Sequence, residues 1–308
     1  MKNKNFLVTG CAGFIGSAVA KRLIDEGSKV VTIDNLSTGS ISNIPKEVTL
    51  IEGDCSDQKI VRTLKKFQFE AILHLSGQSS GEISFENPLY DLRSNAFSTL
   101  LLLEYAMNHN CRKIIYASSM SVYGNQPNLP VNEESYLDPL SLYAVGKIAS
   151  ENYLKIYSAR GMSNTSLRLF NVYGPGQNRL NLKQGMISIY LAQAFNNKKI
   201  IVKGSRKRIR DFVYIDDVVE SFVRILNNKN SSNYQCYNIS TGLKTSVDQV
   251  IKKIINLLPF DVEIEFTEST PGDQNNIYGE SKKFQNDYGK ISFTKVDEGL
   301  TKVIKKYI

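Results

Sequence analysis

A tyrosine and a lysine stand four residues apart in the segment Tyr143-Ala-Val-Gly-Lys147. The surrounding sequence predicts a helix over Leu142–Ala159, and residues four apart on a helix share one face. An ammonium beside a phenol stabilises the phenolate, so we expect Lys147 to lower the pKa of Tyr143 from about 10 towards the working pH. Such a tyrosine can take the proton of an alcohol while a hydride leaves the same carbon.

A serine segment precedes this pair. Ser118-Ser119-Met-Ser-Val-Tyr-Gly124 follows the apolar run Lys113–Ala117 (KIIYA), which predicts a buried strand. Ligands bind at the carboxyl edge of the sheet in open α/β folds, where a serine can hydrogen-bond the reacting oxygen. Chance Tyr-x-x-x-Lys matches are common among 16 tyrosines, but the serine strand and a glycine turn occur here in order with the pair.

The glycine turn is Gly10-Cys-Ala-Gly13-Phe-Ile-Gly16, between the run Asn5–Thr9 (NFLVT) and a helical pattern. The first glycine permits a tight turn, the second allows backbone to approach a pyrophosphate, and the third allows close helix–strand packing. Asp34 ends the next apolar run, where a carboxylate accepts ribose hydroxyls and repels a 2′-phosphate. The sequence therefore predicts a dinucleotide site that prefers NAD to NADP.

Strand and helix patterns alternate over the first 170 residues and must position these groups. The expected strands are Asn5–Thr9, Lys29–Ile33, Val48–Glu52, Ala71–Leu75, Lys113–Ala117 and Ser166–Phe170. Gly16–Glu26, Asp57–Lys66, Asn95–Asn108 and Leu142–Ala159 are the expected helices. Short, nearly continuous apolar runs are typical of strands buried on both faces, so we predict a Rossmann-type, doubly wound parallel sheet in an α/β fold.

The later sequence predicts a smaller α+β lobe, partly interleaved with the first domain. We expect a helix over Ile187–Asn196, a strand over Ile200–Lys203, a helix over Ile215–Leu226, and mixed structure from Thr245 onwards. The expected division is a Rossmann domain of residues 1–174 with about 211–240, and a substrate-binding lobe of 175–210 and 241–308.

Composition is that of an ordinary globular protein, with 42% apolar and 22% charged residues. No run is long enough for a membrane span, and the N-terminal apolar run is too short for a signal peptide, so we expect a cytoplasmic protein. The cysteines are scattered, which predicts reduced thiols and no metal site; they are Cys11, Cys55, Cys111 and Cys236.

The net charge of +8 raises the question of nucleic acid. Acidic residues interrupt the basic ones nearly everywhere, and the one dense run is Lys203-Gly-Ser-Arg-Lys-Arg-Ile-Arg210. This run has no interleaved aromatic residue to stack bases, and no nucleic-acid-binding signature accompanies it. We therefore expect no nucleic-acid partner, and from these residues alone the run could also be a solvated loop.

Successive segments of the chain carry a family resemblance: TGCAGFIGS, IDNLSTG, GDCSD, HLSGQSS, YASSMSVYG, YAVGK, RLFNVYGPGQ and RDFVYIDDVV. They resemble the extended short-chain dehydrogenase/reductases, in the NAD-dependent nucleotide-sugar epimerase/dehydratase branch that includes UDP-glucose 4-epimerase-like members. The resemblance covers essentially the whole chain.

The resemblance implies a catalytic set of Ser119, Tyr143 and Lys147. It implies that NAD is held by Gly10, Gly13, Phe14, Ile15, Gly16, Asp34, Asn35, Thr38, Gly39, Asp54, Cys55, Leu75, Ser76, Gly77, Asn95, Tyr143 and Lys147. It implies substrate contacts at Ser79, Ser119, Tyr143, Asn171, Met186, Arg210, Asp273 and Ile277. Arg210 resembles the arginine that clamps the nucleotide diphosphate, a role that suits a bidentate guanidinium.

Two positions depart from the family pattern. An arginine usually precedes the Pro-Gly-Asp of Pro271-Gly-Asp273 as a second phosphate contact, but Thr270 stands here, so that contact is lost or supplied elsewhere. Ser79 stands where some epimerases of the family carry lysine. The position four after Asp273 resembles one that lines the sugar pocket, and Ile277 there predicts measurable activity on N-acetylated as well as plain sugars.

The residues after Ser119 separate the chemistries that share this scaffold. The 4,6-dehydratases carry Asp-Glu directly after the catalytic serine or threonine, and the decarboxylases place a glutamate in this segment. Met120 and Ser121 stand here, and neither serves as an acid or a base. We therefore expect C4 epimerisation of a UDP-sugar of the UDP-glucose/UDP-galactose type, through a 4-keto intermediate.

A 4,6-dehydratase with displaced acid and base residues, or a 4-keto-sugar reductase, is the enzymatic alternative. An NAD-binding sensor or scaffold is the non-enzymatic one, although an intact Ser119, Tyr143 and Lys147 disfavours it. We also expect a homodimer, because the predicted helices Asn95–Asn108 and Leu142–Ala159 have more apolar surface than one buried face needs, and the resemblance implies pairing through them.

Overall fold

The computed structural model describes residues 1–177, 182–183, 185–228 and 233–306. A parallel seven-stranded sheet, in the order β11-β6-β5-β4-β1-β2-β3, forms its centre. The strands are β1 (Asn5–Thr9), β2 (Lys29–Asp34), β3 (Thr49–Glu52), β4 (Ala71–His74), β5 (Lys113–Ser119), β6 (Ser163–Leu169) and β11 (Gln235–Ile239). All six predicted strands are present within a few residues of their expected bounds, which confirms the doubly wound α/β class. The sequence did not reveal β11.

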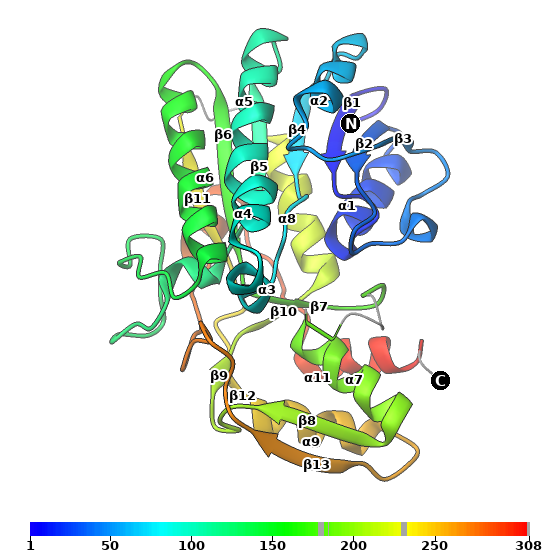
Figure 1. The fold of residues 1–308 in the computed structure, drawn as a ribbon, viewed down its shortest axis with the longest axis vertical. Helices are drawn as coiled ribbons and strands as arrows, with labels where there is room; N and C mark the ends of the chain where they lie inside the picture. Colours follow the sequence, from blue (N-terminus) through cyan, green and yellow to red (C-terminus); the bar gives the residue numbers. More distant parts are fainter. Residues whose placement is uncertain (178–181, 184, 229–232, 307–308) are drawn as a thin grey trace.

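Helices cover both faces of this sheet (Figure 1). They are α1 (Phe14–Asp25), α2 (Gln58–Arg62), α5 (Ser98–Asn108), α6 (Leu142–Ala159) and α8 (Ile215–Asn227). Side chains alternate along β1: Phe6 and Val8 join the core that includes α1 and α8, whereas Leu7 joins the core that includes α2, α5 and α6. This two-sided burial is the reason that β1 is apolar throughout.

The predicted helices differ from the structure mainly at their ends. The expected helix Asp57–Lys66 is α2 followed by a 3-10 turn at Thr63–Lys66. The expected helix Asn95–Asn108 begins within a π-helical turn at Arg93–Phe97 and continues as α5. Two short helices that the sequence did not reveal, α3 (Gly81–Glu86) and α4 (Pro88–Leu92), precede this turn.

A smaller α+β lobe lies below the large sheet in Figure 1. It contains α7 (Met186–Asn197), β8 (Lys199–Lys203), α9 (Val247–Leu257) and β13 (Glu263–Thr267), with β13 parallel to β8. The chain ends with α10 (Lys282–Tyr288) and α11 (Val296–Ile304). These elements confirm the predicted helix and strand after residue 186 and the mixed structure after residue 245.

Two small strand pairs complete the fold. The pair β7 (Asn171–Tyr173) and β10 (Phe212–Tyr214) is parallel, and the pair β9 (Ile209–Arg210) and β12 (Thr245–Ser246) is antiparallel. One core cluster runs from Phe6 of the large sheet to Leu191 and Val202 of the smaller lobe. Because the lobes share this core, their division is a proposal about function. The Rossmann domain would bind the cofactor, and the smaller lobe would bind the substrate.

All four cysteines are buried free thiols, as the scattered spacing predicted. No helix in the described part of the chain combines the length and the apolar character needed to cross a membrane.

Candidate active site

A cavity of about 360 Å³ lies at the carboxyl edge of the large sheet. It lies where the strand order reverses between β1 and β4, the usual ligand position in an open parallel sheet. Most of the predicted site residues line it: Gly10, Gly13, Phe14, Ile15, Gly16, Asp34, Asn35, Thr38, Gly39, Asp54, Cys55, Leu75, Ser76, Gly77, Ser79, Ser119, Tyr143, Lys147, Asn171 and Met186. Asn95, Arg210, Asp273 and Ile277 lie outside this lining.

The glycine turn forms one wall of the cavity. Gly10 has a φ of +79°, and a Cβ built on Gly16 would lie 2.1 Å from the carbonyl oxygen of Gly10, so both positions require glycine. Helix α1 begins directly after Gly13, and no side chain caps its first turn. Its amide N–H groups and the positive end of its dipole therefore remain available to phosphate oxygens.

Asp34 lies at the end of β2 and is nearly buried. Its Oδ2 accepts a hydrogen bond from the backbone N–H of Ala12 at 2.8 Å, and its Oδ1 accepts one from Leu36 at 2.9 Å. A carboxylate has about four acceptor positions, so these two bonds fix its orientation and leave two for ribose hydroxyls.

A group of hydrogen-bonded polar residues extends from Asp34 towards the end of β3. The amide of Asn35 donates to Asp54 at 2.7 Å, and the backbone N–H of Ser56 donates to the other carboxylate oxygen of Asp54 at 2.7 Å. Cys55 is buried beside it and accepts a hydrogen bond from Ser76 at 3.3 Å. These residues have the shape and polarity that suit the adenosine end of a dinucleotide.

Asn95 supports the cavity wall from behind. A Cβ built on Gly77 would lie 2.6 Å from Asn95 Oδ1, and Asn95 Nδ2 donates to the carbonyl of Gln78 and to Asp91, both at 3.0 Å. Gln78 also donates to Asp91 at 2.7 Å. The sequence analysis did not single out Gln78 or Asp91, although Gln78 stands within the HLSGQSS motif.

Helix α6 presents Tyr143 and Lys147 to the cavity. Its N-cap, Ser141, accepts a hydrogen bond from the backbone N–H of Ala144 at 3.2 Å, which places Tyr143 in the first turn. Lys147 Nζ lies 5.4 Å from the centroid of the Tyr143 ring and donates to the carbonyl of Ala117 at 2.9 Å. The shared helical face is as predicted.

The expected effect of Lys147 on the pKa of Tyr143 is not found. Burial raises the pKa of Tyr143 to about 12, and a hydrogen bond with Ser119 opposes this increase only in part. Burial also lowers the pKa of Lys147 to about 8, although the charges of Asp91 and Glu151 act to raise it. Burial of the phenol, to which the charge of Asp91 adds, is therefore the effect that dominates the pKa of Tyr143.

Ser119 ends β5 at the cavity. Its Oγ accepts hydrogen bonds from the hydroxyl of Ser121 at 2.9 Å and from the backbone N–H of Ser121 at 3.2 Å. Met120 also lines the cavity, and Asn171 Nδ2 lies 3.5 Å from its sulfur while donating to the carbonyl of Asp211 at 3.0 Å. A thioether and hydroxyls thus surround the place where a substrate alcohol would meet Tyr143.

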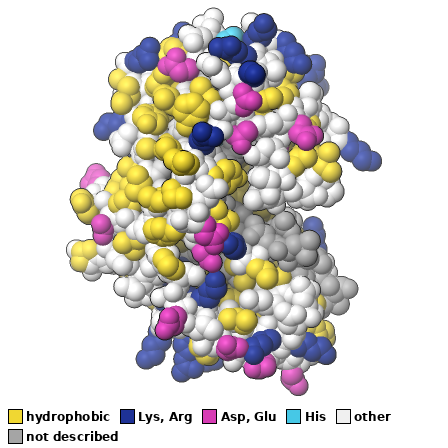
Figure 2. Space-filling model, viewed as in Figure 1, with side chains coloured by type: hydrophobic (Ala, Val, Ile, Leu, Met, Phe, Trp, Pro, Cys, Tyr) yellow, Lys and Arg dark blue, Asp and Glu magenta, His cyan; other side chains and the backbone are white. Residues whose placement is uncertain are grey.

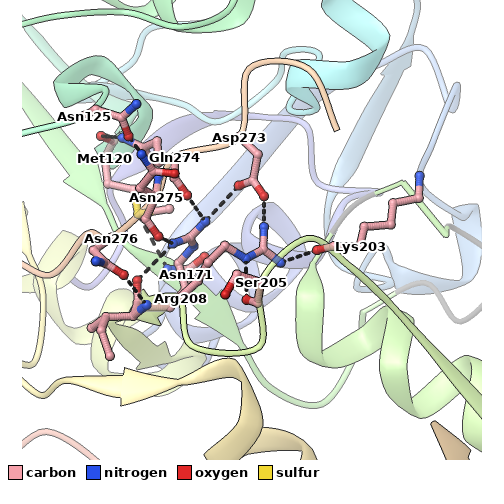
Figure 3. Close-up of polar contacts among 12 residues, drawn as sticks. Met120, Asn125, Asn171, Lys203, Ser205, Arg208, Asp273, Gln274, Asn275 and Asn276 are labelled. Atoms are coloured by element: carbon pink, nitrogen blue, oxygen red, sulfur yellow. Dashed lines mark hydrogen bonds and ion pairs between the residues drawn. The ribbon is translucent and has the colours of Figure 1, made fainter. Parts of the chain in front are cut away.

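The last three predicted substrate residues lie outside the cavity lining, and Figure 3 shows the surroundings of Asp273, one of them. Arg210 is buried and forms an ion pair with Asp273 at 2.8 Å. Ile277 is fully buried in the core, and its backbone N–H donates to Ile209 at 3.1 Å. Ile277 therefore does not line the cavity, so the prediction that it gates N-acetylated sugars loses its structural basis.

The residues present fit a dinucleotide. The crowded Gly10 and Gly16 positions, the uncapped start of α1 and the anchored carboxylate of Asp34 provide a pyrophosphate cradle and a ribose acceptor on adjacent strands. The catalytic tyrosine and lysine line the same cavity. A redox cofactor and its substrate alcohol can therefore meet within one site.

Comparison with known proteins agrees with this geometry. Residues 6–240 match the NAD dependent epimerase/dehydratase family. A putative UDP-glucose 4-epimerase of Methanocaldococcus jannaschii is 34% identical over 300 residues, covering 97% of this chain and 96% of that protein. The chain belongs to the NAD-dependent epimerase/dehydratase family, and its cofactor is NAD.

Solved structures extend the similarity to nearly the whole chain. UDP-glucose 4-epimerase of Thermotoga maritima, in a structure with UDP-glucose, has a TM-score of 0.92 and 29% identity, covering 98% of both chains. An NAD-dependent NDP-hexosamine 5,6-dehydratase involved in tunicamycin biosynthesis has a TM-score of 0.88 and 26% identity, covering 99% of this chain and 98% of that one. This protein is therefore an enzyme of the nucleotide-sugar epimerase/dehydratase group, similar throughout to UDP-glucose 4-epimerases.

Proposed function

We propose that the protein epimerises a UDP-sugar at C4, interconverting UDP-glucose and UDP-galactose through a 4-keto intermediate. The observation that carries this proposal is the placement of carboxylates in the cavity. Among the described residues that line it, the carboxylates are Asp34 and Asp54, which follow β2 and β3. Ser119 lies at the end of β5, on the other side of β4 and β1.

This arrangement favours oxidation and reduction over elimination. Removing water across C5 and C6 of a sugar needs an acid and a base close to the catalytic serine. Met120 and Ser121 occupy that place, and Ser121 is hydrogen-bonded to Ser119. Among the residues that the structure describes, the cavity lining therefore supplies proton transfer at one alcohol and no second acid–base pair beside Ser119.

The residue roles follow from the geometry. Ser119 and Tyr143 would hydrogen-bond the C4 oxygen, and Tyr143, as the phenolate, would take its proton and later return it. Because burial raises the pKa of Tyr143 to about 12, this phenolate would need the positive charge of Lys147 and of bound NAD beside it. Lys147 would hold positive charge near the phenol ring, 5.4 Å from its centroid. When bound, NAD supplies a hydride acceptor and then returns the same hydride, so it is unchanged over a turnover. Epimerisation requires the bound 4-keto sugar to rotate before it is reduced, so that the hydride returns to the opposite face of C4.

The test is incubation of purified protein with UDP-glucose and NAD, with products identified by NMR. Panels of dTDP-, GDP- and CDP-sugars define the nucleotide. The proposal predicts UDP-galactose without net change in NAD. A 4-keto-6-deoxy product would identify a dehydratase, stoichiometric NADH consumption with a keto sugar would identify a reductase, and binding without turnover of any sugar would identify a sensor or scaffold.

We also propose that the protein is a homodimer. Exposed apolar side chains gather on α4, the start of α5 and α6, on the face shown in Figure 2: Leu89, Leu92, Phe97, Leu142, Val145 and Ile156. Tyr157 of α6 is apolar surface that the fold itself covers, because it is buried in the core. A second copy of the chain, pairing the same helices about a two-fold axis, would cover the patch.

A further inference from the structure

A cluster of charged side chains lies outside the cavity lining, between β9 and the loop after β13 (Figure 3). Arg208 and Arg210 both form ion pairs with Asp273, one with each carboxylate oxygen. The side chains of Arg208 and Arg210 are 9% and 3% exposed, whereas the side chain of Asp273 is 22% exposed. The cluster therefore opens to solvent on the side of Asp273.

The charges in this cluster do not balance. Two guanidiniums share one carboxylate, which leaves an excess positive charge in a largely buried place, and buried charges are normally paired. Burial lowers the pKa of Arg210, and the guanidinium of Arg208 lowers it further. Burial also lowers the pKa of Arg208. Burial is the largest cause of both shifts, and a single carboxylate faces the two guanidiniums, so an anionic ligand would supply the negative charge that balances them.

Arg208 keeps donors for such a ligand. Its Nε donates to the carbonyl of Ser205 at 3.1 Å, one terminal nitrogen donates to the carbonyl of Lys203, and the other pairs with Asp273. A guanidinium has five N–H donors, so one on each terminal nitrogen has no acceptor among the described residues. These two N–H groups belong to the fork that binds phosphate oxygens in bidentate fashion.

The cluster adjoins the substrate end of the cavity. Asn171, a cavity residue, donates to the carbonyl of Asp211, the residue directly after Arg210. Gln274, directly after Asp273, donates to the carbonyl of Gly124 at 2.8 Å and lies 3.4 Å from that of Met120. These hydrogen bonds connect the segments that carry the arginines and Asp273 to residues at the catalytic end of the cavity.

Arg208 also lies beside the segment that departs from the family pattern. A Cβ built on Gly204 would lie 3.2 Å from Arg208 Cζ and 3.1 Å from Ser269 Cβ, so the guanidinium and the residue before Thr270 flank the same glycine. Arg208, the residue directly before β9, thus lies close to Ser269, the neighbour of Thr270.

We propose that Arg208 is a diphosphate-binding residue, pairing with Arg210 on the substrate's diphosphate and replacing the arginine absent at position 270. Asp273 is a positioning residue, because both of its oxygens hold the guanidiniums side by side. The assignment rests on the proposed action on a nucleoside-diphosphate sugar, but not on which reaction the sugar undergoes.

Calorimetric titration with UDP, uridine and inorganic pyrophosphate tests this assignment. Arg208→Gln should weaken UDP and pyrophosphate binding by about tenfold or more, the effect of losing charged hydrogen bonds of about 1.5 kcal/mol or more, and leave uridine binding unchanged. Lys207→Gln, which removes the same charge from an exposed neighbour, should change the affinity for UDP less than twofold. NAD binding and melting temperature confirm that each variant is folded.

Two further variants keep the test decisive. Arg208→Lys retains the charge without the fork and should lose part of the UDP affinity, and adding Thr270→Arg to Arg208→Gln should restore some of it. Unchanged UDP affinity in Arg208→Gln would overturn the proposal, and so would an equal loss of uridine and UDP binding, which would indicate a role in folding the lobe. None of these titrations requires turnover, so failure of the proposed epimerisation would show separately.

Discussion

Tyr143 is the residue on which the chemistry depends most. Burial desolvates its phenol and raises the pKa to about 12. Ser119 is hydrogen-bonded to this phenol, and Lys147 Nζ lies over its ring. Removing the hydroxyl deletes the proton acceptor but leaves the ring's packing. We expect Tyr143→Phe to retain NAD and UDP-sugar binding while kcat falls at least about a hundredfold, the usual contribution of a general base.

Steady-state kinetics and a cofactor titration on the same preparation measure both effects. Tyr136→Phe is the matched control, because Tyr136 is 76% exposed and should leave kcat unchanged. Near-parental turnover by Tyr143→Phe would remove this residue from the mechanism.

We expect Asp34 to set the preference for NAD over NADP. The backbone N–H groups of Ala12 and Leu36 hold its carboxylate where a 2′-phosphate would approach, and two negative charges in contact cost several kcal/mol. We therefore expect NADP to bind at least about tenfold more weakly than NAD, and Asp34→Asn to narrow that ratio.

Calorimetry with both dinucleotides is the measurement, with Asp25→Asn, at the far end of α1, as the control. If the parent protein bound NADP as tightly as NAD, or more tightly, this interpretation of Asp34 would be wrong.

The sequence placed residues correctly wherever local spacing decides their position. Tyr143 and Lys147 share one helical face, and the glycine turn joins β1 to α1, because each pattern lies within a few residues of chain. The surroundings of Ile277 were misjudged and Arg208 was missed, because only the fold decides what these two residues contact. Ile277 packs behind β9, and the function of Arg208 depends on Asp273, 65 residues later. The fall in the pKa of Tyr143 was expected from the charge on Lys147, and burial reversed it.

At the scale of elements, His74 joins three parts of the Rossmann domain. It ends β4, and its ring nitrogens contact Thr9 of β1 at 2.9 Å and Thr99 of α5 at 3.2 Å. Burial lowers the pKa of His74 to about 3. The folded state thus keeps this ring neutral down to about pH 3, whereas the unfolded chain protonates it near about pH 6.5.

This difference predicts a pH dependence of stability. Between those two pKa values the unfolded state binds more protons, so the free energy of unfolding contributed by His74 falls as pH falls, by about 1.4 kcal/mol per pH unit. Urea unfolding from pH 6 to pH 4 should show a shallower pH dependence in His74→Gln than in the parent. His109→Gln, the control at the exposed second histidine, should keep the parental slope. Equal slopes in all three proteins would show that His74 does not carry this effect.

Elements were predictable where burial leaves a strong pattern. Most of the six strands found by sequence are short apolar runs buried on both faces, such as β1 and β4. β11 reads QCYNI, in which Gln235 and Asn238 interrupt the apolar run, and it pairs with β6 from about 70 residues away in the chain, where local reasoning has no information. The two-residue strands β9 and β12 form only where the fold brings distant segments together.

For the whole molecule, the apolar patch on α4, α5 and α6 predicts a dimer. We expect light scattering at micromolar concentration to give twice the mass of one chain. Val145→Glu with Ile156→Glu would place charges in the patch and should give monomers. Leu243→Glu, on a similarly exposed leucine of the loop after β11, should remain dimeric. A monomeric parent protein would reject the dimer.

The central claim is that one hydride leaves C4 of the sugar and returns to the opposite face of the same carbon. The most direct test is turnover of UDP-galactose carrying deuterium at C4, in ordinary water, with the product examined by NMR. We predict UDP-glucose that retains the deuterium at C4, with NAD unchanged in amount. Deuterium found at C6 of a 4-keto-6-deoxy sugar, or lost to solvent, would contradict the account.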